Sequence, residues 1–341
     1  MGTQIGEILE KQEIDFSFLN GRRIGIDSFN VLYQFLSIIR GADGTPLMDS
    51  KGRITSHLTG LLYRTINLLE AGALPVFVFD GKPIELKKET SKARNEIRTA
   101  AEKKFKEAKE KGETEEARKF AMQATRLTPE MVEEAKTLVE LMGLPVVQAI
   151  NDGEAQASQM VDNGTLYGCV SQDFDSLLFG AKRLFRNVTV SGKRKVPGKN
   201  YHYDIKPELI ELEKNLSLLG IDRKKLVWIG ILVGTDFNKK FPKIGPKTAL
   251  QLVKKFSSFE EIIKETKHEP DFDYRGIEEI FLHPKFSEDF KIEFKPMQKE
   301  KIMSFLCDER DFSRERVENA LNKIVERVDF SAKQSRLSSW I

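Results

Sequence analysis

The sequence predicts an α/β fold with a mainly parallel central sheet and helices on both of its faces. One observation is size, because 341 residues with 40% hydrophobic content suffice for one large core or two smaller ones. Another is the presence of four short apolar runs with the length and the β-branched or aromatic content of strands. These runs alternate with segments of helical apolar spacing, and such alternation is typical of parallel sheets.

The predicted strands lie in the first half of the chain, next to predicted helices. The strands are RRIGI (22–26), LPVFVF (74–79), LPVVQAI (144–150) and LYGCVS (166–171). Helical spacing is clearest at residues 30–40, 56–70 and 129–142. This order predicts strand and helix units that build one sheet.

Two segments do not follow this alternation. Residues 84–128 form a long charged stretch with helical composition, and residues from about 207 onward are mostly helical with few strand signals. Predicted helices at 224–233 and 248–256 flank a turn at Gly245-Pro246-Lys247, which indicates a helical hairpin at about 220–260 with exposed backbone N–H groups. We expect residues 1–330 to form a single domain and residues 331–341 a flexible tail.

Several classes of protein are excluded. No apolar run approaches the roughly 18 to 20 residues that a bilayer requires, and the N-terminus lacks the basic and apolar regions of an export signal. Cys169 and Cys307 lie far apart and outside any Cys-x-x-Cys spacing, which argues against a disulfide framework or a thiolate metal site. We therefore expect a cytoplasmic protein without a membrane partner.

Positive charge is concentrated in the insertion. The whole chain has a net charge of +3, whereas residues 85–126 hold 13 Lys and Arg against 9 Asp and Glu. This local excess suggests contact with a polyanion, but a solvated helix face with i,i+4 ion pairs has the same composition. Charge alone leaves both interpretations open.

Acidic residues follow the end of every predicted strand. They are Asp27, Asp80, Asp152, Glu154, Asp173 and Asp175. Any one of them can be a helix N-cap or a turn residue. However, ligands bind beyond the carboxyl ends of strands in open α/β sheets, so all six side chains should converge there. Carboxylates this close repel strongly unless a cation neutralises them.

The donor set predicts the metal and the reaction. The four histidines lie outside the acidic motifs, and oxygen donors without His or Cys select Mg²⁺ or Mn²⁺. Six acids exceed the need of one ion but suit two ions bridged by a phosphate, which predicts phosphodiester hydrolysis. A seventh acid, Asp236, can join the second ion if the helical half folds back over the sheet.

Five strings, RIGIDSFN, VFVFDGKP, SQDFDSLLFG, LVGTDFN and KIGPKTALQLV, resemble the structure-specific 5′ flap endonucleases, most closely the archaeal members. The resemblance extends from Gly2 to Ile341. It implies a monomeric, Mg²⁺-dependent endonuclease with 5′ to 3′ exonuclease activity. Such an enzyme removes the 5′ flaps of branched DNA in Okazaki fragment maturation and long-patch base excision repair.

The resemblance also assigns the metal ligands. It implies that Asp27, Asp80, Asp152 and Glu154 serve one Mg²⁺ and Asp173, Asp175 and Asp236 a second, some through water, with Mn²⁺ able to substitute. One position departs from the family, which usually has Glu-x-Glu where this chain has Asp152-Gly153-Glu154. The shorter Asp152 side chain is therefore expected to coordinate through water or to shift the ion.

DNA contacts follow from the same resemblance. The insertion would form a helical arch in which Lys87 and Arg94 engage the scissile phosphate, unless they are ordinary solvated cations. Tyr33 would stack on a base, unless it is a core residue. The remaining positions that match the family's DNA contacts are Gly2, Arg40 and Thr55 at the junction and upstream duplex, and Gly245 and Lys247 at the downstream duplex.

The hairpin resembles the family's helix-two-turn-helix, in which backbone amides and a bound K⁺ hold duplex phosphates. The usual Gly-Ile-Gly is Lys243-Ile244-Gly245 here. If the first position needs a positive φ, Lys243 is strained by about 1 kcal/mol or more.

The tail resembles a sliding-clamp-binding motif, with Gln334 as the polar anchor and an apolar plug of Leu337, Trp340 and Ile341. Two other functions stay open at this point. One is a relative that cuts bubbles or Holliday junctions, against which the short insertion and the clamp motif argue. The other is a non-catalytic junction-binding scaffold recruited by the clamp, which would need the acids to be lost.

Overall fold

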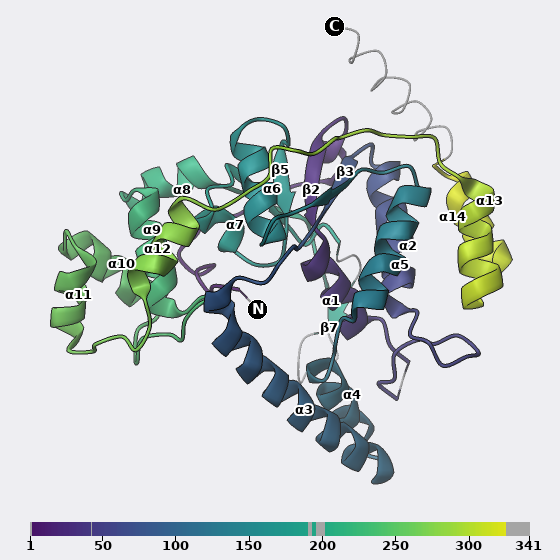
Figure 1. Cartoon of the computed structure of the whole chain (residues 1–341), viewed down its shortest axis with the longest axis horizontal. Helices are drawn as coiled ribbons and strands as arrows, with labels where there is room; N and C mark the ends of the chain where they lie inside the picture. The colour runs from purple at the N-terminus through teal and green to yellow at the C-terminus, as the bar shows by residue number, and fades with distance from the viewer. Residues whose placement is uncertain (1, 42, 190–192, 196–201, 325–341) are drawn as a thin grey trace, which may run out of the picture.

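The structure is a computed structural model that describes residues 2–41, 43–189, 193–195 and 202–324. The predicted clamp-binding residues Gln334, Leu337, Trp340 and Ile341 lie outside the described residues. Figure 1 shows a central sheet between layers of helices, with a helical pair projecting below it. Nowhere in the described ranges does a helix have both the length and the apolar content to cross a bilayer.

The central sheet has seven strands in the order β1-β9-β6-β5-β2-β3-β4. The four predicted strands are present as β2, β3, β4 and β5, and they pair in parallel, as does β6 with β5. Strand β9 is antiparallel to both β6 and β1. The bounds are β1 Gln12–Glu13, β2 Arg23–Asp27, β3 Leu74–Phe79, β4 Val146–Gln148, β5 Gly168–Val170, β6 Arg183–Arg186 and β9 Glu208–Glu211.

The α/β fold class is confirmed, but the sequence did not predict the strands on one side of the sheet. β1, β6 and β9 have two to four residues each, too few for a clear period of two. Strand β9 falls where we expected mostly helix. A separate two-stranded sheet joins β7 Lys193–Lys195 to β8 His202–Asp204.

Helices cover both faces because the chain changes direction in the middle of the sheet. From β2 to β4 it moves one way, through α1 Ser28–Ile38, α2 Ser56–Glu70 and α5 Pro129–Leu141. From β4 to β6 it moves back, through α6 Gly153–Asp162 and α7 Asp175–Leu178. Right-handed crossovers place these two groups on opposite faces. The reversal lies between β2 and β5, which is where such sheets bind ligands.

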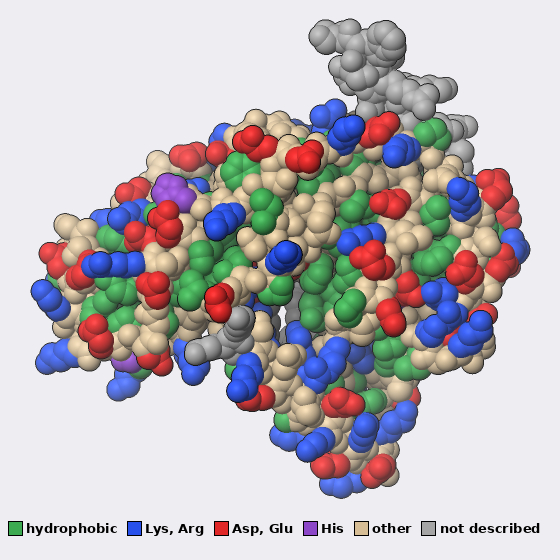
Figure 2. All heavy atoms as spheres, in the orientation of Figure 1, with side chains coloured by type: hydrophobic (Ala, Val, Ile, Leu, Met, Phe, Trp, Pro, Cys, Tyr) green, Lys and Arg blue, Asp and Glu red, His purple; other side chains and the backbone are tan. Residues whose placement is uncertain are grey.

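The insertion between β3 and β4 is a helical pair, which we call the arch. A short 3-10 turn, Glu85–Lys87, leads into α3 Lys88–Glu110, and α4 Thr114–Gln123 returns along it. The buried residues of the pair are alanines, Ala101 and Ala108 on α3 and Ala117 and Ala121 on α4, which lets the helices approach closely. Figure 2 shows this lobe set off from the body and rich in Lys and Arg.

The second half of the chain is mostly helical. It contains α8 Leu212–Leu219, α9 Arg223–Val233, α10 Pro246–Lys255, α11 Phe259–Thr266 and α12 Tyr274–Leu282, which form one side of the molecule (Figure 1). Residues 283–298, without helix or strand, then cross to the opposite side (Figure 1). There α13 Lys299–Met303, a π-helical turn Ser304–Asp308 and α14 Arg314–Asn322 pack near α2 and α5.

Candidate active site

A cavity of about 710 Å³ opens at the carboxyl edge of the sheet, beneath the arch. All seven predicted acids line it: Asp27, Asp80, Asp152, Glu154, Asp173, Asp175 and Asp236. The structure therefore brings together side chains from four strand ends and from the loop after α9. Among the described side chains that line it, none is a histidine.

Neighbouring polar groups hold the strand-end acids in place. Asp27 caps α1 by accepting from the Asn30 N–H at 3.1 Å, and its second oxygen accepts from the Ser171 hydroxyl at 3.2 Å. Asp80 accepts from the Gly153 N–H at 2.7 Å, and Asp175 from the Thr3 N–H at 2.9 Å. Capping and site formation are thus not exclusive, because one carboxylate can do both.

The Asp152 and Glu154 pair sits at the start of α6. Asp152 Oδ1 caps the helix, accepting from the Glu154 N–H at 3.0 Å, while Oδ2 pairs with the Lys87 ammonium. Glu154 accepts from both the backbone N–H of Ser176, at 2.9 Å, and the Ser176 hydroxyl. Both acids are about nine-tenths buried, so their carboxyl groups are largely removed from solvent.

Burial changes the protonation of these carboxyls. Desolvation, with repulsion from Asp152, raises the pKa of Asp80 to about 7. Desolvation, with repulsion from Asp236 and Asp173, raises the pKa of Asp175 to about 7. The pKa values of Asp27 and Glu154 are raised well above their ordinary range for the same reasons. Such a cavity takes up cations readily, because a bound cation lets every carboxyl ionise.

Two arch cations reach into this cavity. Lys87 pairs with Asp152, and Arg94 Nη1 lies 3.2 Å from Asp236 Oδ2. Their side chains are only 24% and 31% exposed. Burial lowers the pKa of Lys87, but the nearby carboxylates outweigh burial and raise it above its ordinary value. This geometry does not fit the alternative of two ordinary solvated cations.

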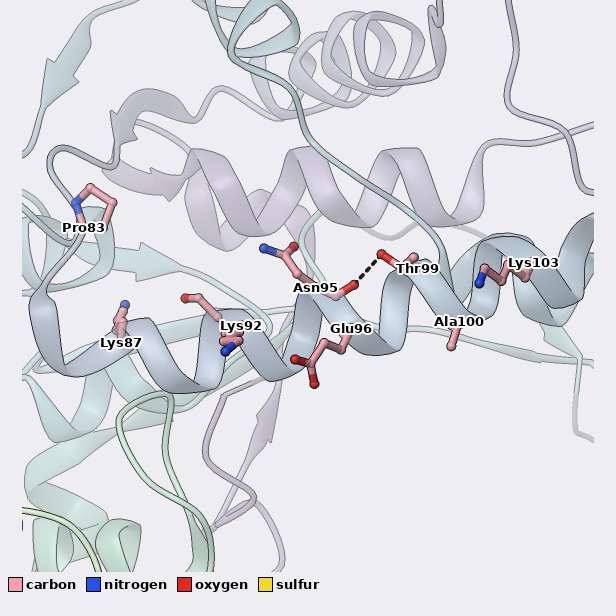
Figure 3. Close-up of a pocket in the computed structure, with 9 residues that line it drawn as sticks. Pro83, Lys87, Lys92, Asn95, Glu96, Thr99, Ala100 and Lys103 are labelled. Carbon is pink, nitrogen blue, oxygen red and sulfur yellow. Dashed lines mark hydrogen bonds between the residues drawn. The ribbon is translucent and has the colours of Figure 1, made fainter.

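Lys87 also borders a second hollow of about 780 Å³ along α3. Figure 3 shows Lys87, Lys92 and Lys103 spaced along this helix beside the hollow, with the Thr99 hydroxyl donating to the Asn95 carbonyl at 2.9 Å. Basic residues are thus distributed along α3, and Lys87, at the N-cap of this helix, pairs with an acid of the cavity.

The donor set fits hard divalent cations. The acidic groups of the cavity are aspartates and a glutamate, whose oxygens suit Mg²⁺ or Mn²⁺, and the described part of its lining includes no Cys or His. Within the described residues, no three such side chains have donors already gathered for one ion. Asp152 and Asp236 instead point to Lys87 and Arg94.

The structure favours some of the predicted DNA contacts more than others. Tyr33 lines the cavity half-buried, with the Arg98 guanidinium over its ring at 4.9 Å, so it is not a core residue. A Cβ on Gly2 would lie 2.6 Å from the Asp173 Cβ, so only glycine fits there. Arg40 joins the Thr125 hydroxyl at 2.7 Å, at the end of the arch. Thr55 is buried, which does not favour its direct contact with DNA.

The predicted helical hairpin is formed by α9 and α10. Lys243 has φ +60, which confirms that a non-glycine residue occupies the left-handed region there. Gly245 is the N-cap of α10, and a Cβ added to it would meet no other atom within 4 Å. Lys247 is exposed and pairs with Glu7 at 2.6 Å.

Sequence reasoning missed the residues that orient the acids. Asn30 donates to Asp173 at 3.0 Å, and Thr3, Ser171 and Ser176 hold three other carboxylates. Asn30 and Ser171 stand next to acidic motifs, which was a usable signal. The hydrogen bond from Thr3 to Asp175 joins residues 172 positions apart, and no signal in the sequence indicated it.

Two family models match the chain. The XPG N-terminal domain matches residues 3–101 and the XPG I-region residues 143–236. Among curated relatives, flap endonuclease 1 of Thermococcus onnurineus is 52% identical and that of Pyrococcus furiosus 53%, each over 100% of this chain and 99% of the relative. The solved flap endonuclease-1 of Methanococcus jannaschii is 41% identical, with a TM-score of 0.77 over 97% of this chain and 100% of that one.

Fold and site together define a nuclease of the XPG type, a family that is generally metal-dependent. The relatives narrow this class. The chain belongs to the flap endonuclease 1 family, whose members are structure-specific 5′ flap nucleases of replication and repair.

Proposed function

We propose that this chain hydrolyses the phosphodiester at the junction of single- and double-stranded DNA with two Mg²⁺ ions, which Mn²⁺ can replace. The observation that carries the proposal is the convergence of seven carboxylates beneath two partly buried cations. When bound, the ions supply a hydroxide nucleophile and stabilise the leaving oxygen.

The residues of the chain have distinct roles in this proposal. Asp27, Asp80, Asp152 and Glu154 hold one ion, and Asp173, Asp175 and Asp236 the other, partly through water. Lys87 and Arg94 move from their carboxylate partners onto oxygens of the scissile phosphate. Their ion pairs in the structure support this, because they show that both side chains reach the acids.

Substrate binding extends beyond the cavity. We assign the unpaired strand to the arch, the junction to Gly2, Tyr33 and Arg40, and the downstream duplex to Gly245 and Lys247 with a K⁺ ion. The catalytic core of Rad2 with DNA substrate and human GEN1 with Holliday junction DNA each reach a TM-score of 0.68. At 21% and 20% identity, they share the fold alone.

The test is cleavage of a labelled double-flap substrate in Mg²⁺, beside a single strand, a bubble and a Holliday junction. We expect strong preference for the flap. Faster cleavage of the bubble or the Holliday junction would instead support a relative with another substrate. Tight flap binding without any cleavage would support the non-catalytic scaffold.

Recruitment by a sliding clamp through Gln334, Leu337, Trp340 and Ile341 remains a prediction, as do the monomeric state and a cytoplasmic site of action. Titration of a fluorescent peptide of residues 332–341 against the clamp, with and without Trp340→Ala, tests recruitment. Binding that is unaffected by Trp340→Ala would refute the apolar plug.

A further inference from the structure

Two large apolar side chains stand exposed on the otherwise charged arch. Ile97 on α3 is 61% exposed and Met122 on α4 is 43% exposed. Both line the acid-lined cavity, as Tyr33 does from α1. None of the three belongs to the hydrophobic core of the described residues or to the side chains packed against it. Single exposed apolar residues are common, but two that line one cavity together with a half-buried tyrosine, from three helices, suggest a shared ligand.

Ile97 continues the helix face that carries the arch cations. Ile97 lies three residues after Arg94, and Arg98 lies four residues after Arg94, so both neighbour Arg94 on the surface of α3 and line the same cavity. Both are about one turn, roughly 5 Å, beyond Arg94 along the helix. Arg98 in turn lies over the Tyr33 ring at 4.9 Å. The cavity thus passes from acids and cations to an apolar surface with a cation beside it.

This combination suits single-stranded nucleic acid. Cations pair with successive phosphates, while apolar and aromatic side chains contact the faces of unstacked bases. In a duplex, those base faces are stacked on each other and unavailable. A small hydrophobic ligand would need no cations, and a phosphate alone would need no apolar surface.

We propose that Ile97 and Met122 extend the base contact expected of Tyr33 into a base-contact wall for the unpaired nucleotides next to the scissile phosphate. This inference rests on the proposed function, since it requires a single strand in the cavity. Ile97 and Met122 are positioning residues, because they contact bases and not the reacting atoms. The wall recognises that bases are unpaired and not which bases they are, because every base offers an apolar face.

The experiment compares the double variant Ile97→Ser/Met122→Ser with Leu218→Ser, a matched control on α8 that is 60% exposed and does not line the cavity. Binding and single-turnover cleavage are measured on a normal flap and on one whose first flap nucleotides are abasic. For the wild type, we expect abasic residues to weaken binding about tenfold. The double variant should bind the normal flap about tenfold more weakly than the wild type does. On the abasic flap, the double variant and the wild type should bind almost equally. Leu218→Ser should match the wild type.

Salt dependence provides a second readout. Loss of an apolar contact leaves the slope of log affinity against log salt unchanged, whereas loss of a phosphate contact lowers it by about one. Thermal unfolding shows whether the variants are as stable as the wild type. The milder pair Ile97→Ala/Met122→Ala is measured in the same way, so that a folding defect is not mistaken for a lost contact.

Two results would contradict the proposed base-contact wall. One is a double variant that binds both flaps as the wild type does, and the other is an equal loss on normal and abasic flaps. In either case, normal cleavage by the wild type leaves the proposed function standing. A wild type that neither binds nor cuts flaps overturns the proposed function as well.

Discussion

The acidic wall of the cavity and the arch that faces it hold their charges in opposite ways. Asp27 and Asp175 come from the carboxyl edge of the sheet and are 7% and 4% exposed, held by hydrogen bonds from neighbouring residues. Most arch charges lie on the surface, as Lys106 does with its side chain 70% exposed. Lys87 and Arg94 are exceptions that pair with the acids. Burial and pairing, more than the number of charges, thus distinguish residues suited to chemistry.

The largest effect should come from the acidic wall. Asp175→Asn keeps an acceptor for the Thr3 N–H but removes a charge, so we expect cleavage to fall at least about a hundredfold while flap binding persists. Single-turnover rates and equilibrium binding in Mg²⁺ measure both. Near wild-type cleavage would refute the role of Asp175 in the two-ion site.

The second largest effect on cleavage should come from replacing the arch cations that pair with the acids. Lys87→Ala and Arg94→Ala should lower turnover about a hundredfold and affinity much less, because in the proposed reaction both side chains act on the reacting phosphate. Lys106→Ala is the matched exposed control and should change neither quantity much. Equal losses in turnover and affinity would make Lys87 and Arg94 general electrostatic contacts instead.

Asp152 has two structural roles, since it caps α6 and also pairs with the arch cation Lys87. Asp152→Asn keeps the cap and removes the charge, whereas Asp152→Ala removes both. We expect each to lose about tenfold or more in cleavage, and Asp152→Glu to be active with an altered Mg²⁺ optimum. If Asp152→Asn cuts normally across a Mg²⁺ titration, Asp152 is a helix cap alone.

The smallest effect concerns a cation outside the cavity. Lys243 has φ +60, so Lys243→Gly should raise the free energy of unfolding by up to about 1 kcal/mol. Lys247→Gly, in the first turn of α10, should give no gain and provides the control. Urea unfolding measures both, and equal stability of the Lys243 variant and the wild type would show that no strain is stored.

The sequence predicted what depends on local patterns. Apolar runs followed by acids located four strands and six ligand candidates, and the missing glycine at Lys243 indicated the strained turn. It did not predict what depends on contacts between distant segments. Strand β9 exists because it pairs with β6, and Glu154 is oriented by Ser176 from another helix. Ile97 is an ordinary apolar residue of a charged helix in the sequence, and only the fold shows that it lines the same cavity as Tyr33.

The arch is anchored at the same edge of the sheet that carries the acids. Where the arch leaves β3, Gly81 and Lys82 donate from their backbone N–H groups to the carbonyls of Asn151 and Ile150, just after β4. Where the arch ends, the Thr125 hydroxyl accepts from Arg40 at 2.7 Å. Because these contacts lie outside α3 and α4, the two helices between them can be lengthened or shortened without changing how the arch is attached. The arch can therefore change in size while the edge of the sheet that carries the acids stays as it is.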